Sequence, residues 1–247
     1  MKLAAACLQL DVGNSGAKWR LLQRAEVVAR GKYIAADESS RQALLACTAE
    51  LEQIWISSVA APAAESDLLA LLESHWDVVP WMARTEARTG DLVNSYDDPT
   101  RMGVDRWLVM LAARQHDAGK LCVVDAGSAL TIDIVSASGR HEGGYIIPGP
   151  ALMERALLLD TDRVRFAEDV EYQLTPGTST AQAVRHGIAL AQAGAVALVL
   201  DHHSGEPMQV LFCGGGGELL MRLLDRGGMY LPDLVFEGLQ EMALLSA

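Results

Sequence analysis

Cysteine is scarce in this chain of 247 residues, which holds only Cys7, Cys47, Cys122 and Cys213. The four lie far apart in apolar surroundings, and no two have the short spacing of a zinc site. We therefore expect buried, reduced thiols rather than metal ligands. Half of the residues are hydrophobic, which is enough to bury the core of one or two domains.

Basic residues are also few, since 20 Lys and Arg face 32 Asp and Glu and leave a net charge of −12. A nucleic-acid partner needs a basic face for its phosphates, so this balance argues against one. The balance does not argue against ATP. A bound Mg²⁺, a lysine and backbone N–H groups set the field at a local phosphate site.

Long apolar runs and two common ATP-binding motifs are missing as well. No run reaches the roughly eighteen residues of a membrane span. The apolar residues 1–10 lead directly into a polar turn rather than a cleavage site, so no signal peptide is predicted. We expect a cytoplasmic protein with no membrane partner. Neither a GxxxxGK[ST] P-loop nor a protein-kinase glycine-rich loop with its VAIK strand is present.

The turn after the first predicted strand combines residue types that suit polyphosphate. Its candidate ligands are Asp11, Gly13, Asn14, Ser15, Gly16 and Lys18. The glycines let backbone N–H groups approach an anion, and the polar side chains add short donors and a positive charge. Asp11 could hold Mg²⁺, through water if not directly. An ordinary hairpin turn is the alternative explanation.

A second copy of this pattern begins close to half the chain length later. Asp125, Gly127 and Ser128 again follow an apolar strand, and another strand comes after them. The duplication predicts two related halves, residues 1–117 and 118–247, that face each other across a nucleotide cleft. Three strands open each half, and helices and strands follow, which predicts an α/β fold with mixed sheets.

Two further segments carry candidate site residues. Gly103, Val104, Asp105 and Arg106 open a helix directly after the aperiodic segment 83–100. Asp105 could instead only compensate the helix dipole, with Arg106 a solvated charge. Later, strand 209–213 runs into a four-glycine turn and a helix. That arrangement brings a helix N-terminus to a nucleotide, although four glycines also fit a plain flexible turn.

In this order, the two Asp-x-Gly turns, Gly-x-Asp-Arg, Gly-Gly-x-Ile-x-Pro-Gly and the late glycine turn resemble the type III pantothenate kinase family. The family belongs to the acetate/sugar kinase, Hsp70 and actin superfamily. The resemblance covers about residues 8–240. It implies two ribonuclease H-like domains, each a mixed five-stranded sheet flanked by helices, with ATP in the cleft between them.

The resemblance also implies an activity and its requirements. The family phosphorylates pantothenate to 4′-phosphopantothenate with ATP, the first step of coenzyme A biosynthesis. It is a phosphotransferase with an alcohol group as acceptor. It uses Mg²⁺ together with K⁺ or NH₄⁺, and it works as a homodimer. The alanine-rich helix 179–200 is consistent with close packing against a second copy, and packing inside its own subunit is the alternative.

The resemblance assigns residues by motif. Asp105 is expected to be the general base, and Asp125 the ligand of the monovalent cation. Pantothenate contacts are expected from Tyr96, Gly103, Val104, Asp105 and Arg106, with Thr180 near the dimer interface. ATP contacts are expected from the turn at Asp11 and from Ser128, Gly214 and Gly215. Both phosphate turns carry Ser where the family commonly has Thr, and the turn 213–218 departs from the family pattern.

Two alternatives stay open on the sequence alone. One keeps the fold and changes the substrate, to a small sugar or polyol kinase or a polyphosphate hydrolase of the same superfamily. The other is a non-enzymatic regulator, because the family has also carried the name Bvg accessory factor. The Gly103–Arg106 block favours pantothenate, and the acidic composition with an intact Asp105 favours an enzyme.

Overall fold

The protein, seen in a computed structural model that describes residues 5–161 and 163–246, folds as two compact units. The second unit spans Ala113–Asp233, and the first holds the chain up to Ala112 together with the segment from Leu234. The predicted division at 117/118 gave the whole C-terminal segment to the second half, so the structure differs there. The first strand is predicted at residues 3–11, and residues 3 and 4 lie outside the described residues.

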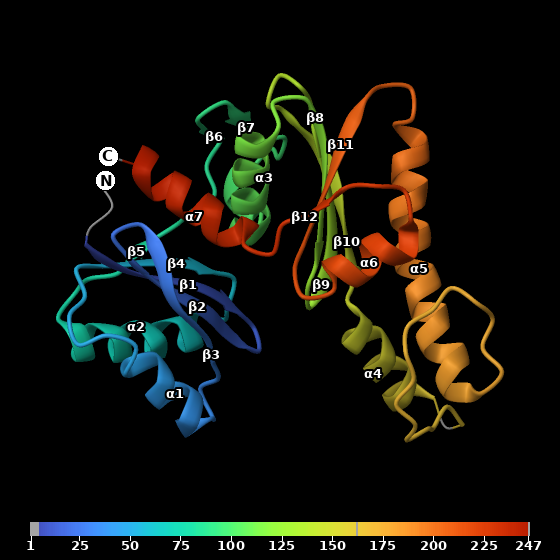
Figure 1. Cartoon of the computed structure of the whole chain (residues 1–247), viewed down its shortest axis with the longest axis horizontal. Coiled ribbons are helices and arrows are strands. Elements are labelled where there is room, and N and C mark those ends of the chain that lie inside the picture. The colour runs from blue at the N-terminus through green and yellow to red at the C-terminus, as the bar shows by residue number, and fades with distance from the viewer. Residues whose placement is uncertain (1–4, 162, 247) are drawn as a thin grey trace. The chain divides into compact units, whose positions relative to one another are not determined.

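The first unit is built on a five-stranded sheet in the order β3-β2-β1-β4-β5 (Figure 1). Its strands are β1 Ala6–Gly13, β2 Gly16–Gln23, β3 Glu26–Tyr33, β4 Gln53–Ser58 and β5 Trp81–Met82. The first three form an antiparallel meander, and β4 and β5 continue the sheet in parallel with β1. The sheet is therefore mixed, as the sequence predicts.

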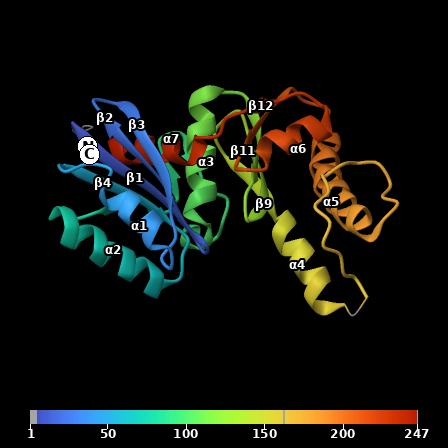
Figure 2. The same cartoon turned by 60° about the horizontal axis from the view of Figure 1, so that its bottom comes forward.

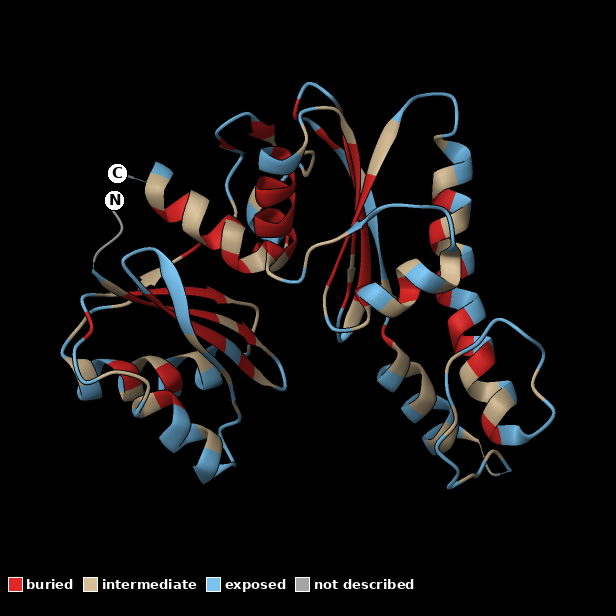
Figure 3. Ribbon diagram, viewed as in Figure 1, coloured by how far each residue is buried: buried red, intermediate tan, exposed pale blue. Residues whose placement is uncertain are grey.

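The two faces of this sheet pack against different helices. On one face, Leu8 and Leu10 form a core with α1 (Glu38–Leu45) and α2 (Pro62–Trp76). Figure 3 shows the buried residues gathered on the strands and on the helix surfaces that face them. The other face receives α7, Leu234–Leu245, which packs on β1 and β4. Periodicity marks α7 as amphipathic but does not say which sheet it covers.

Two predicted elements end in different places. The sequence predicts a helix from Ser39 or Ser40 to about residue 52, but α1 stops at Leu45, because the chain turns at Thr48, whose hydroxyl donates to the carbonyl of Glu50 at 2.8 Å. The sequence also predicts a strand at 78–81, where the structure has the two-residue β5, whose residues pair with Trp55 and Ile56. Both differences arise at short, weakly periodic boundaries.

The segment 83–100 is an ordered part of the first unit. It contains a small hairpin of β6 (Arg88–Thr89) and β7 (Leu92–Val93) and the 3₁₀ turn η1 (Pro99–Arg101). The indole nitrogen of buried Trp107, in α3 (Val104–His116), donates to the hydroxyl of Thr89 at 3.1 Å. This contact fixes the hairpin against the helix that follows it.

The second unit repeats the sheet of the first in the order β10-β9-β8-β11-β12. Its strands are β8 Lys120–Ala126, β9 Ala129–Val135, β10 His141–Pro148, β11 Met208–Cys213 and β12 Met229–Tyr230. The antiparallel and parallel pairings fall at the same places as in the first unit. The predicted fold class, with two mixed five-stranded sheets flanked by helices, is confirmed.

Three helices accompany the second sheet, namely α4 Pro150–Asp160, α5 Thr180–His202 and α6 Gly217–Leu224. Residues of α5 and α6 complete a core with β8, β9 and β11, and α4 lies beside α5 (Figures 1 and 2). Among the described helices, α5 alone is long and apolar enough to cross a membrane, and 39% of its apolar window is buried. A core helix of a soluble protein meets the same criteria.

One arginine anchors the irregular segment between α4 and α5. The Arg185 side chain, on α5, donates to Glu154 of α4 at 3.1 Å and to the carbonyl of Val170 at 2.6 Å. It also pairs with Asp169 and lies over the ring of Tyr172. These contacts tie the segment to both helices.

Three of the cysteines are buried and one is intermediate, and all four are free thiols. Burial raises the pKa of both Cys7 and Cys122 to about 12. These two thiols therefore stay protonated and unreactive near neutral pH.

Within the first unit, α3 and α7 cross where Gly238 meets the backbone of Leu108. A Cβ at this glycine would overlap the Leu108 carbonyl oxygen and carbon. We expect Gly238→Ala to destabilise the protein by about 1–3 kcal/mol, because the helices must separate to admit a methyl group. Urea denaturation followed by circular dichroism measures the difference. The matched control is Gly205→Ala, where a Cβ meets nothing within 4 Å. Equal stability of the two variants would contradict the close crossing.

Candidate active site

The turn between β1 and β2 is a two-residue hairpin loop made of Asn14 and Ser15, both exposed. Gly13 and Gly16 pair across its base. Gly16 has a φ of +149°, and a Cβ there would lie 2.5 Å from the carbonyl oxygen of Tyr33. A side chain at this position would push β3 away, so the close approach of these strands depends on glycine.

Asp11 and Lys18 lie directly opposite each other on β1 and β2. Directly paired residues of neighbouring strands share one face of a sheet. The same register places Lys32 of β3 beside Lys18, and both lysines are exposed. The sequence analysis missed Lys32, since only the pairing of β2 with β3 reveals it. A carboxylate and two ammonium groups thus stand in one row next to the hairpin loop.

The start of α3 orients the carboxylate of Asp105. Its Oδ1 accepts the backbone N–H of Arg106 at 2.8 Å. A Cβ at Gly103 would lie 2.6 Å from the same oxygen, so glycine leaves room for the carboxylate to fold back over the backbone. Asp105 itself is partly exposed, whereas the side chain of Val104 is buried.

Arg106 is buried to 4% exposure and contacts a tyrosine from the preceding segment. Its Nη1 donates to the hydroxyl of Tyr96 at 2.9 Å, and its guanidinium carbon lies 5.9 Å from the centre of that ring. The backbone of Tyr96 is fixed in turn by a 2.9 Å hydrogen bond from its N–H to the side chain of Asn94. These contacts join four predicted residues into one cluster: Tyr96, Gly103, Asp105 and Arg106.

In the second unit, the glycine turn after β11 wraps the end of β8. Gly214 has a φ of +76°, and a Cβ there would overlap both Oδ1 of Asp125 and the carbonyl of Ala126. The N–H of Gly216 donates to that carbonyl at 2.8 Å. The predicted residues Asp125, Gly214 and Gly215 are thus brought together, and α6 begins directly after them.

Tyr230 of β12 supports this turn from outside and was not predicted. Its hydroxyl donates to the carbonyl of Gly214 at 3.2 Å. Burial raises the pKa of Tyr230, with a further contribution from the charge of Glu218, so the phenol keeps its proton for this hydrogen bond. On the other side of the turn at Gly127–Ser128, the N–H of Gly149 donates to the Ser128 carbonyl at 3.0 Å. Ser128 itself is exposed.

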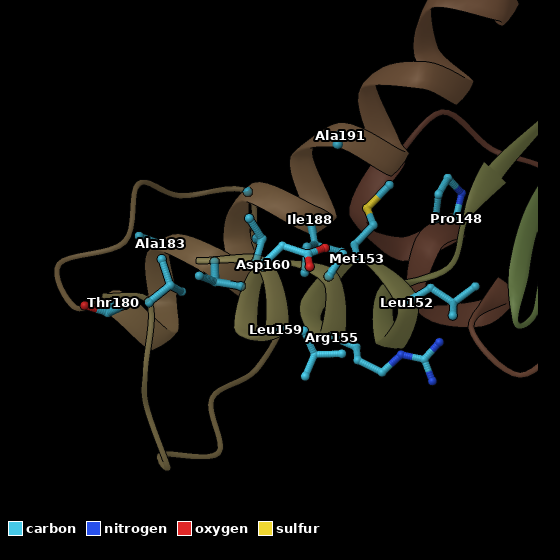
Figure 4. A pocket seen from close by; sticks show the side chains of 15 residues that line it. Pro148, Leu152, Met153, Arg155, Leu159, Asp160, Thr180, Ala183, Ile188 and Ala191 are labelled. Atoms are coloured by element: carbon cyan, nitrogen blue, oxygen red, sulfur yellow. The ribbon is translucent and has the colours of Figure 1, made fainter. Parts of the chain in front are cut away.

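Thr180 stands at a different place in the second unit. It is exposed at the first residue of α5, after Ser179, whose hydroxyl accepts the N–H of Gln182. It borders an apolar groove of about 1000 Å³ between α4 and α5, lined also by Leu152, Met153 and Ile188 (Figure 4). The residues that line this groove include Thr180 but neither Asp125 nor the glycines of the turn after β11.

The described residues contain no group of three or more His, Cys, Asp or Glu side chains that could hold a metal ion. Mg²⁺ bound through one or two carboxylates, with phosphates and water supplying the remaining oxygens, needs no such group. Asp11 and Asp125 each offer one partly exposed carboxylate at the end of a central strand. The carboxylate oxygens at both positions are ligands that suit a hard cation such as Mg²⁺.

Comparison with known proteins decides the family. Residues 7–202 match the family described as type III pantothenate kinase. The chain belongs to this family. A type III pantothenate kinase from Hahella chejuensis is 36% identical over 96% of both chains, and one from Thiobacillus denitrificans is 38% identical over 95% of both. The predicted membership is confirmed.

A solved structure supports the fold of this type III pantothenate kinase family member. A protein from Campylobacter jejuni, described as belonging to the Baf family of transcriptional activators, superposes with a TM-score of 0.59 at 22% identity. The alignment covers 96% of this chain and 97% of the other. At this identity the similarity concerns the fold alone.

Gly214 and Gly215 form a matched pair for testing the turn around Asp125. We expect Gly214→Ala to destabilise the protein by more than about 1 kcal/mol, because its φ is positive and a methyl group would collide with Asp125. Gly215→Ala should change stability by less than about 0.5 kcal/mol, since a Cβ there meets nothing within 4 Å. Thermal unfolding without ligands measures both. Equal melting temperatures would rule out the close approach.

Proposed function

We propose that the protein transfers the γ-phosphoryl group of ATP to the primary hydroxyl of pantothenate, giving 4′-phosphopantothenate. The observation that carries the proposal is the cluster of Tyr96, Gly103, Asp105 and Arg106 at the start of α3. Family membership supplies the reaction, and this cluster supplies a base and a cationic group in one place.

Asp105 acts as the general base in this proposal. The N–H of Arg106 and the space left by Gly103 orient its carboxylate before substrate arrives. A carboxylate oxygen accepts the proton of the pantothenate hydroxyl while the hydroxyl oxygen attacks the γ-phosphorus in line with the leaving ADP oxygen. One P–O bond forms, one breaks, and the proton moves to Asp105.

Arg106 binds the carboxylate of pantothenate. A guanidinium pairs with a carboxylate in a fixed, bidentate geometry, and burial strengthens the interaction. The hydroxyl of Tyr96 accepts one of its N–H groups and so holds the guanidinium plane in place. Gly103 and Val104 contribute backbone to the same pocket, because the Val104 side chain is buried.

Phosphate binding is assigned to the turns. In the first unit, Gly13, Asn14, Ser15, Gly16 and Lys18 donate to the phosphates, and Ser128 does so in the second. Gly214 and Gly215 lie on the nucleotide side. Asp11 would hold Mg²⁺, either directly or through a water in the shell of the ion. Asp125 would hold K⁺ or NH₄⁺. These cations offset the negative charge of the transferring group.

We also propose a cytoplasmic homodimer that binds neither nucleic acid nor a membrane. The apolar groove between α4 and α5 supports this proposal, as do Leu190 and Leu198 of α5, which are 59% and 57% exposed. A second copy covering this surface would remove its apolar side chains from water. Thr180, at the edge of the groove, would then reach the pantothenate pocket of the neighbouring subunit.

Asp105→Asn tests the reaction. We expect kcat to fall by about 10²–10⁴-fold while the melting temperature is kept, because the near-isosteric amide accepts no proton. Pantothenate-dependent formation of ADP is the measurement, with Asp97→Asn as a control in the exposed loop before η1. Near-normal turnover of Asp105→Asn would refute the base assignment. ATP consumption with sugars or polyols but not with pantothenate would refute the substrate.

Mixing two defective variants tests the shared pocket. In a heterodimer of Asp105→Asn and Thr180→Ala subunits, one pocket carries both defects and the other carries neither. We expect each heterodimer to recover about half of the activity of a wild-type dimer, because catalysis at an intact pocket is independent of the other. Subunit exchange followed by activity assay makes the measurement. No recovery, or a fully active monomer by light scattering, would contradict the shared pocket.

A further inference from the structure

Two buried hydroxyl groups have no hydrogen-bond partner among the residues that the structure describes. They are Oγ of Ser57 on β4 and Oγ1 of Thr131 on β9. Ser57 has 0% of its surface exposed and Thr131 has 8%. Most buried polar groups in folded proteins are paired, so each exception requires a specific explanation, such as a bound ion or water.

Both hydroxyls stand beside a strand-end aspartate. Ser57 is the direct partner of Asp11 in the parallel pairing of β4 with β1. Thr131 is the direct partner of Asp125 in the antiparallel pairing of β9 with β8. Directly paired residues share one face of the sheet, so each hydroxyl lies on the same face as its carboxylate. The same combination occurs in two units that fold around separate cores.

The remaining unpartnered buried atoms differ in chemistry. They are the side-chain nitrogens Nε2 of Gln9 and Nε1 of Trp19 and Trp55. Such N–H groups donate but do not ligate a cation, whereas a hydroxyl oxygen can accept a proton or bind a cation directly. Among the unpartnered buried side-chain atoms of the described residues, the two hydroxyl oxygens can thus bind a positive ion, and each lies beside a carboxylate.

We propose that Ser57 and Thr131 complete the two cation sites. Ser57 positions a water in the hydration shell of the divalent cation at Asp11, because Mg²⁺ gives up its waters reluctantly. Thr131 supplies a hydroxyl oxygen to the monovalent cation at Asp125, where oxygen dipoles replace hydration water. The inference rests on the proposed function, and Ser57 is a positioning residue that acts through water.

The two strands next to each aspartate explain why the sites differ. Asp11 is flanked by Lys18 and Ser57, and Asp125 by Thr131 and Cys213. An ammonium group beside Asp11 suits a site where phosphate charge accompanies a divalent ion. The neighbours of Asp125 carry no positive charge, which suits a single monovalent cation.

The test removes each hydroxyl and measures each cation separately. Mn²⁺ binding in the presence of a non-hydrolysable ATP analogue, followed by electron paramagnetic resonance, reports the divalent site. Thermal stabilisation by K⁺ relative to Na⁺ reports the monovalent site. Both readouts are independent of turnover. Loss of an outer-sphere partner typically weakens metal binding about 10–100-fold.

We expect Ser57→Ala to weaken Mn²⁺ binding about tenfold and to leave the K⁺ response unchanged. Thr131→Val should abolish the K⁺ response and leave Mn²⁺ binding unchanged. Ser58→Ala is the matched control for Ser57, because the Ser58 hydroxyl already accepts the N–H of Ala60 at 3.4 Å. Thr131→Ser keeps the hydroxyl and should therefore keep the K⁺ response. This variant separates loss of the hydroxyl from any loss of stability in Thr131→Val.

Unchanged binding of both cations in Ser57→Ala and Thr131→Val would overturn the proposal, as would equal losses of both cations in each variant. The outcome is separable from that of the proposed function. A wild-type protein that binds both cations but does not phosphorylate pantothenate would refute the function and leave the cation sites standing. An active wild type with variants of unchanged cation binding would refute only the present inference.

Discussion

The central strand of each sheet carries an aspartate near its C-terminal end, Asp11 in β1 and Asp125 in β8, and backbone lies close around these positions. This close packing accounts for several otherwise separate features. Gly214 has a positive φ and no room for a Cβ beside Asp125, and Gly16 lets β3 approach the hairpin that follows Asp11. Gly103 plays a comparable part for Asp105 on α3. Close approaches to a carboxylate at positions 103 and 214, and to the Tyr33 carbonyl at position 16, explain the glycines found there.

An acidic protein can still place basic side chains together locally, and here the pairing of β2 with β3 does so. Lys18 pairs with Lys32, so two exposed ammonium groups lie beside Asp11, whereas Arg20 on the same strand is buried against Gln9 and Phe236. The net charge of −12 is carried elsewhere on the chain. Global charge therefore says little about a small anion held at one turn.

The sequence predicted the fold class, the duplicated turn and the family, because these depend on local patterns that read directly from the chain. It missed Lys32, Ser57 and Tyr230, which lie beside the predicted residues Lys18, Asp11 and Gly214 only through strand pairing or a distant strand. The contact of Arg106 with Tyr96 brings together two positions that the resemblance had placed at the substrate. The last helix was given to the second half, since amphipathic periodicity does not name the sheet that a helix covers.

The return of α7 to the first unit has a consequence for folding during synthesis. The second unit is continuous from Ala113 to Asp233, so all of its strands and helices leave the ribosome before α7 does. The first unit begins earlier but lacks the helix that covers β1 and β4 until the whole second unit has been synthesised. Vectorial synthesis therefore favours completion of the second unit first, while the face of the first sheet that carries Gln9 and Arg20 waits for Phe236 of α7.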